Sequence, residues 1–271
     1  MKEQQKQMSF LDHLEELRWM LVRSAAVVFA FALIAFVFSD FIFNKIIFVF
    51  QDKNFITYRV LCNLSKFFSS DGFCIEETSF SIQSLKMAEQ FSAHIWMAIT
   101  FGLILAFPYI VFEIWKFLKP ALFKTEQKSA KSFIISSSFL FFLGILFGYY
   151  ILAPLTINFF GNYSVSDTIE RNFKLSSYIA IVKTSVMSSG FLFELPIVIY
   201  FLTKFGIVTP EFLKENRKYS LVIILILAAI LTPADILSQF VVAVPMLLLY
   251  EFGIIISKRI VKKQQASLVE L

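Results

Sequence analysis

Long apolar runs separated by polar segments dominate the chain. We place six of them, at residues 24–43, 92–115, 132–155, 177–202, 219–231 and 236–256. A helix of about 20 residues crosses the ~30 Å hydrocarbon core of a bilayer, and most of these runs reach that length. The fifth run would reach only about 20 Å, at 1.5 Å per residue. The pattern predicts an all-α polytopic membrane protein with six transmembrane helices, the last two short, in a single domain over residues 1–271.

Residues 1–23, before the first run, have the pattern of an amphipathic helix. Ser9, followed three residues later by Asp12, predicts a helix N-cap with an acidic partner. Apolar residues recur behind it at helical spacing: Phe10, Leu14, Leu17 and Leu21. The opposite side carries polar groups: Asp12, His13, Glu15, Glu16 and Arg23. We expect this helix to lie at a membrane surface and to lead into the first span.

Composition agrees with a membrane location. Hydrophobic residues make up 58% of the chain, whereas about 45–50% is usual in soluble domains, and the mean hydropathy is +0.72. Charged residues make up 17%, too few to cover a globular surface of this size. The net charge of +5 does not indicate nucleic acid, because Lys and Arg stand in blocks between the apolar runs. Such blocks contact lipid headgroups, so the expected partner is the bilayer.

The distribution of basic residues predicts the orientation. Four segments, 1–23, 116–131, 203–218 and 257–271, together hold 17 of the 25 Lys and Arg residues. Because short cytoplasmic loops carry the excess of Lys and Arg, these segments are predicted to be the cytoplasmic start, two loops and tail. Both termini are therefore expected in the cytoplasm, and residues 44–89 form the first outer loop.

The chain's two cysteines, Cys62 and Cys74, both fall in this outer loop. Outside the cytoplasm two thiols can pair, and closing so short a loop would contribute roughly 3 kcal/mol in the chain-entropy model. We expect a disulfide, with two free thiols as the alternative.

Several polar groups interrupt the later runs. Glu194 lies inside the fourth run, within Phe193-Glu-Leu-Pro196. An acidic residue at the centre of a span costs about 2.5–3.5 kcal/mol on insertion scales, so it either pairs with a neighbouring helix or lines a polar cavity. Asp235 and Gln239 follow the short fifth run in Thr232-Pro-Ala-Asp-Ile-Leu-Ser-Gln239 and would share a helix face. Asp235 is also a candidate cap for the sixth helix.

The third run contains Gly144 and Gly148, four residues apart. This spacing allows a second helix to approach closely, so we expect a packing role for the two glycines.

No motif for covalent chemistry is readable. The chain has no phosphate-binding Gly-x-x-x-x-Gly-Lys-Ser/Thr, no His-Glu-x-x-His and no Gly-x-Ser-x-Gly. The two histidines, His13 and His94, lack metal-ligand spacing. We expect no enzyme activity, no cofactor and no metal.

Four motifs together resemble those of the TatC family, the large polytopic subunit of the twin-arginine protein translocase. His13-Leu-Glu-Glu-Leu-Arg18 resembles its N-terminal signature. Trp115-x-Phe117-x-x-Pro120-Ala-Leu-x-x-x-Glu126 resembles its first cytoplasmic loop. The two motifs that contain Glu194 and Asp235 resemble those of its later spans.

The resemblance implies a receptor for twin-arginine signal peptides on folded precursor proteins. It assigns Glu16 and Glu126 to the twin arginines, with Leu17, Arg18 and Phe117 in support. Glu194, Asp235 and Gln239 would line or shape a cavity in the membrane. The implied partners are single-span subunits similar to TatA and TatB and further copies of the chain, with transport driven by the proton-motive force across a bacterial inner membrane.

A second class of function is a small ion- or proton-coupled secondary transporter that uses Glu194. Inverted repeats would favour it, but the short fifth run and the sixth run have no counterpart in the first half of the chain. A scaffold without a ligand is a third reading, and it predicts that Glu16 and Glu126 are replaceable.

Overall fold

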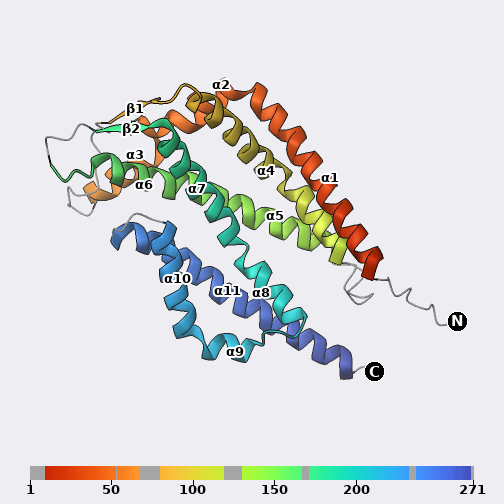
Figure 1. Ribbon diagram of the computed structural model, residues 1–271. Helices are drawn as coiled ribbons and strands as arrows, with labels where there is room; N and C mark the ends of the chain where they lie inside the picture. Colours follow the sequence, from red (N-terminus) through yellow and green to blue (C-terminus); the bar gives the residue numbers. More distant parts are fainter. Residues whose placement is uncertain are drawn as a thin grey trace. The chain divides into compact units, whose positions relative to one another are not determined.

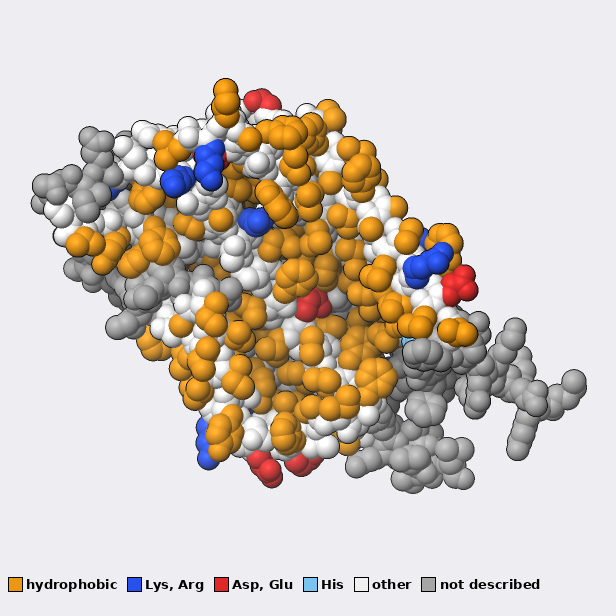
Figure 2. Space-filling model, viewed as in Figure 1, with side chains coloured by type: hydrophobic (Ala, Val, Ile, Leu, Met, Phe, Trp, Pro, Cys, Tyr) orange, Lys and Arg blue, Asp and Glu red, His pale blue; other side chains and the backbone are white. Residues whose placement is uncertain are grey.

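The computed structural model describes residues 10–52, 54–67, 80–118, 130–166, 171–231 and 236–269. Helices account for nearly all of this part of the chain (Figure 1). Five helical segments within it are long and apolar enough to cross a membrane: His13–Val37, Glu89–Leu118, Lys131–Asn162, Leu175–Lys204 and Gln239–Lys262. The predicted all-α polytopic membrane fold is confirmed. Figure 2 shows hydrophobic side chains over much of the visible surface of these helices, as contact with lipid requires.

The last two helices differ in length. Helix α10 (Arg217–Leu231) has 15 residues, so the fifth run is short as predicted. Helix α11 (Ile236–Val269) has 34 residues and continues through the predicted tail, so the expectation that the last two spans are both short is wrong for the sixth. Its polar end contains Lys, Arg and Gln, which favour helix without being apolar. Hydropathy marks the edge of the bilayer and does not mark the end of the helix.

The segments on the predicted outer side contain helices and strands as well as loops. The first has a π-helical turn (Ile42–Ile47), a 3-10 turn (Phe48–Gln51), α3 (Ile56–Phe67) and strand β1 (Ser81–Gln83). Strand β2 (Asn172–Lys174), which directly precedes Leu175 at the start of α7, pairs in parallel with β1. The sequence analysis did not predict this two-stranded sheet. Strands of three residues are too short to show a recognisable alternation of hydrophobic and polar positions in the sequence.

Tyr58 on α3 anchors the segment that connects α1 to α4. Its side chain is buried, and its hydroxyl donates to the carbonyl oxygens of Phe50 and Pro154 at 3.1 and 3.3 Å. Burial raises the pKa of the Tyr58 hydroxyl above its ordinary value, so the group stays protonated and keeps donating.

The chain divides into two compact units. The first comprises Met1–Asp40 and His94–Phe139. In it α1 (Phe10–Val37) packs antiparallel to α4 (Glu89–Leu118), of which the unit contains the part from His94 onward. A Cβ atom at Gly102 of α4 would lie 2.7 Å from the Val28 carbonyl oxygen of α1, so only glycine permits this close approach. The predicted amphipathic start and the first span form one continuous helix, α1.

The second unit comprises Phe41–Ala93 and Leu140–Leu271. It contains the end of α5 (Ala130–Phe147), a π-helical turn (Gly148–Leu152), α6 (Ala153–Asn162), α7 (Leu175–Phe193), α8 (Leu195–Lys204), α9 (Pro210–Glu215), α10 and α11. Its apolar core joins α8, α10 and α11 through buried side chains that include Ile199, Ile224, Ala228, Met246 and Ile254.

Gly144 and Gly148 lie against α7, as their spacing predicted. A Cβ at Gly144 would lie 2.6 Å from the carbonyl oxygen of Ser189, and one at Gly148 would lie 2.7 Å from that of Ser185. The backbone around Gly144 and Gly148 therefore lies directly against the backbone of α7 along this stretch.

The fourth run is two helices, α7 and α8, that meet at Glu194. Glu194 ends α7 and precedes α8, with φ −75° and ψ −5°. Pro196 causes the break, because it has no N–H to donate to the carbonyl four residues earlier and its ring crowds that carbonyl.

Candidate functional site

One face of α1 carries three polar side chains toward its N-terminal end. His13, Glu16 and Arg23 are three and seven residues apart, so they lie on the same side of the helix. The His13 ring stacks on the Phe117 ring of α4, with centroids 4.3 Å apart and planes at 22°. The same face therefore contacts the C-terminal end of α4, which brings Phe117 to the level of the predicted signature.

Glu16 lies on this face with an unused acceptor. Its Oε2 atom is buried and has no hydrogen-bond partner among the residues that the structure describes. A buried polar atom without a partner costs about 1–3 kcal/mol, and more when the group is charged. Such an atom is a natural acceptor for a cationic ligand that donates N–H groups.

The neighbouring predicted residues are placed as follows. Leu17 is half-buried, whereas Arg18 is exposed, with its guanidinium 5.5 Å from the centre of the Trp19 ring. Glu126 lies outside the described residues, so the predicted pairing of Glu16 and Glu126 at one site stays a prediction. What the structure brings together is His13 and Phe117, with Glu16 one helical turn from His13 on the same face of α1.

An ion pair that the sequence analysis missed lies further along the same helices. Arg23 donates from Nε and Nη2 to Glu113 Oε2, at 3.1 and 2.9 Å, and the Tyr109 hydroxyl donates to Glu113 Oε1 at 3.0 Å. The Glu113 side chain is 4% exposed and that of Arg23 is 38% exposed. A signal was available, because a carboxylate inside the second apolar run and a guanidinium at the edge of the first each require a partner.

The intramembrane polar residues belong to the second unit. Glu194 is half-buried at the junction of α7 and α8. Gln239 Nε2 donates to the Leu225 carbonyl oxygen at 3.2 Å, which links α11 to α10. Asp235 lies outside the described residues, so its shared face with Gln239 and its capping role are not tested.

The cysteines and the possible metal ligands do not extend the candidate site. Cys62 is half-buried on α3, but Cys74 lies outside the described residues, so the disulfide stays a prediction. A search of the described residues for groups of His, Cys, Asp and Glu that could hold a metal finds none.

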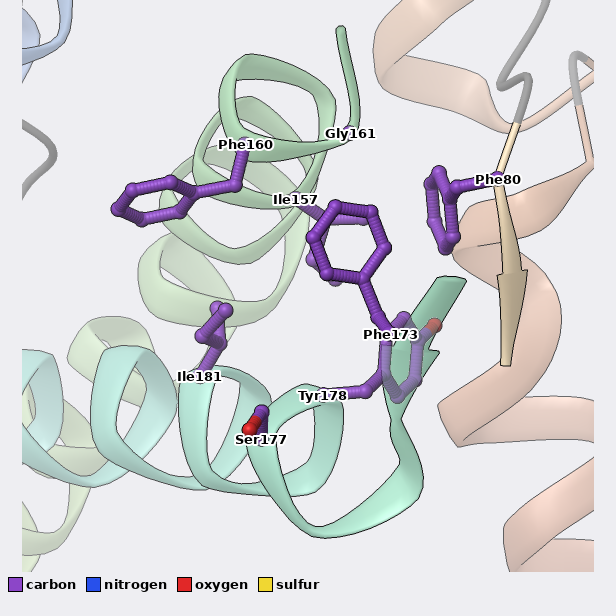
Figure 3. A pocket seen from close by; sticks show the side chains of 8 residues that line it. All are labelled: Phe80, Ile157, Phe160, Gly161, Phe173, Ser177, Tyr178 and Ile181. Atoms are coloured by element: carbon purple, nitrogen blue, oxygen red, sulfur yellow. The ribbon is translucent and has the colours of Figure 1, made fainter. Parts of the chain in front are cut away.

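The second unit has a small hollow of about 290 Å³, counted with its open mouth (Figure 3). It is lined by Phe80, Ile157, Phe160, Gly161, Phe173, Ser177, Tyr178 and Ile181. Its lining is almost wholly apolar, and the Tyr178 hydroxyl is already used by the Ile47 carbonyl at 2.7 Å. The hollow therefore offers packing space and no reactive group.

Comparison with known families decides the identity. The model of the Sec-independent protein translocase protein (TatC) matches residues 12–245. The chain belongs to the TatC family. It is a multi-pass membrane subunit of a twin-arginine translocase, and the resemblance of its four motifs to TatC is confirmed.

Relatives in the TatC family match over nearly the whole chain. The TatC of Blattabacterium sp. subsp. Periplaneta americana is 40% identical over 97% of this chain and 100% of its own length. The protein named TatCy of Bacillus subtilis is 31% identical over 96% of this chain and 93% of its own length.

Two solved structures of TatC proteins resemble this chain in both sequence and fold. The crystal structure described as that of the twin-arginine translocase receptor TatC is 30% identical, with a TM-score of 0.65 over 92% of this chain and 99% of that one. A second such structure, in DDM, is 31% identical, with a TM-score of 0.69 over 90% and 99%.

Proposed function

We propose that the chain is the signal-peptide receptor and core subunit of its translocase, and that it recognises twin-arginine signal peptides of folded precursor proteins. The observation that carries this is the buried, unpartnered Oε2 of Glu16 on the face of α1 that contacts α4. The description of the two similar solved proteins as translocase receptors supports it.

Arginine fits this acceptor better than lysine does. A guanidinium is planar and presents parallel N–H groups to a carboxylate, whereas an ammonium acts as a point charge. The site would use Glu16 for one arginine of the pair and Glu126 for the other. Surrounding lysines repel a cationic ligand, so selectivity rests on these two acids.

Other residues would support the bound peptide. Phe117, held by the His13 ring, offers an apolar surface beside the acidic group. Leu17 and Arg18, the next two residues of α1, would be supporting positions for the peptide. Glu194, Asp235 and Gln239 would shape a membrane cavity for the signal peptide or for a partner helix.

The proposal extends to the assembly. The chain would lie in a bacterial inner membrane with both termini in the cytoplasm. It would associate with single-span subunits similar to TatA and TatB and with further copies of itself. Transport would be driven by the proton-motive force, and the chain would make or break no covalent bond.

Photo-crosslinking tests where the peptide lies. A photoreactive phenylalanine analogue at Phe117 should capture an Arg-Arg signal peptide and should capture its Lys-Lys version far less. The matched control is the same analogue at Phe139, which is 66% exposed on α5 in the same unit. Equal capture at both positions, or equal capture of both peptides at Phe117, would refute the assignment.

A further inference from the structure

The packing of α1 on α4 depends on few contacts. In α1, only 11% of the most apolar 18-residue stretch is buried inside the protein. In the other four candidate spans, the buried share of the corresponding stretch is 39–44%. The ring contacts between the two helices run in antiparallel order, from His13 with Phe117 to Phe36 with His94. At the outer end, His94 Nε2 also lies 2.9 Å from the Phe36 carbonyl oxygen.

Among the residues that the structure describes, the Arg23–Glu113 ion pair is the hydrogen-bonded contact between α1 and α4 that lies nearest to the candidate site. Side chains on a helix tilt toward its N-terminus. Because the helices are antiparallel, Arg23 tilts toward the level of Glu16, while Glu113 tilts away from the level of Phe117. Their charged ends therefore meet one to two turns from Glu16, on the membrane side.

Both carboxylate oxygens of Glu113 accept hydrogen bonds. Both Glu113 oxygens are engaged, Oε2 by Arg23 and Oε1 by Tyr109. Such a pair accepts one alignment of the two helices. An apolar contact would tolerate sliding, whereas two converging N–H donors on one buried oxygen do not.

We propose that Arg23 and Glu113 are positioning residues of the recognition site: their ion pair sets the register of α1 against α4 and so holds Glu16 beside Phe117. A slip of one residue would move Glu16 by about 1.5 Å along the axis and turn it by about 100°. Bidentate recognition of a guanidinium does not survive an error of about 1 Å. This inference rests on the proposed signal-peptide function.

The test measures selectivity. The Kd values of an Arg-Arg and a Lys-Lys signal peptide are compared on the detergent-purified full chain, as wild type, Glu113→Gln and the reversed pair Arg23→Glu/Glu113→Arg. The ratio of the two Kd values should fall about tenfold in Glu113→Gln, a loss of about 1.4 kcal/mol of discrimination, and return in the reversed pair. His94→Ala is the control, because it loosens the same two helices at their other end and should leave the ratio unchanged.

A second readout reports register without any peptide. Cysteines are placed by His13→Cys and Phe117→Cys and joined with a short bismaleimide, and the linked peptides are identified by mass spectrometry. The yield should drop when Glu113→Gln is added and recover with the reversed pair.

The outcomes separate the two claims. Two results would make the pair merely structural and overturn the inference. One is an unchanged ratio of Kd values in Glu113→Gln. The other is an equal loss of affinity for both peptides that the reversed pair does not restore. If wild type shows no preference for Arg-Arg, the proposed function fails, and the crosslinking yield alone decides whether the pair sets the register. Should Glu113→Gln not insert, Glu113→Asp replaces it under the same criteria, because it keeps the charge and shortens the reach.

Discussion

Adding a single methyl group at Gly144 tests the contact between α5 and α7. In Gly144→Ala the new Cβ would lie 2.6 Å from the Ser189 carbonyl oxygen, 2.8 Å from Phe193 Cβ and 2.9 Å from Gly190 Cα. Carbon atoms pack at about 3.5–4.0 Å, and two of these neighbours are backbone atoms that cannot rotate away. The helices must therefore separate by about 1 Å.

The cost follows from that separation. A gap of about 1 Å forfeits up to half of the dispersion energy of the atoms along the contact, and overpacking of this kind typically costs about 1–3 kcal/mol. A loss of 1 kcal/mol lowers the Tm of a chain of this size by about 2–4 °C. We expect Gly144→Ala to lower the Tm by several degrees.

The assay is heating of the detergent-solubilised protein, followed by size-exclusion chromatography of what remains folded. Leu146→Ala is the control on the same helix, because Leu146 is 52% exposed and its truncation removes little buried contact. A Tm for Gly144→Ala equal to that of wild type would refute the packing of α5 on α7 described above.

Three further predictions concern the second unit. In Gly206→Ala the positive φ of 71° becomes strained although the Cβ meets nothing within 4 Å, so thermal unfolding should show a loss of about 1 kcal/mol. Thr203 Oγ1 donates to Ser257 Oγ at 2.9 Å in a buried pair, so Thr203→Val or Ser257→Ala alone should cost about 1–3 kcal/mol. The double variant should cost less than the sum, and strict additivity in the same melts would count against the bond. Alkylation should label Cys62 and Cys74 only after reduction, and equal labelling without reductant would exclude the disulfide.

The spans were predictable because lipid imposes a simple rule. Every spanning segment must be an apolar helix, so hydropathy located the runs, and the spacing of Gly144 and Gly148 indicated the close approach of a second helix. The break at Glu194 was not predicted, although Pro196 provided its physical cause.

Other features depend on long-range geometry. The pairing of Arg23 with Glu113 requires the antiparallel register of α1 and α4, which no local pattern contains. The same holds for β1 and β2, whose three-residue strands pair across a long stretch of sequence. The polar end of α11 looked like a tail because its apolar pattern stops well before its helix does.

Peptide binding tests the central claim most directly. An Arg-Arg signal peptide and its Lys-Lys version are titrated against the detergent-purified protein, as wild type and as Glu16→Ala/Glu126→Ala. The account predicts a preference for Arg-Arg in wild type that disappears in the double variant, while the Tm of the two proteins stays similar. A preference that survives the loss of both glutamates would contradict it, because the arginines would then be recognised elsewhere.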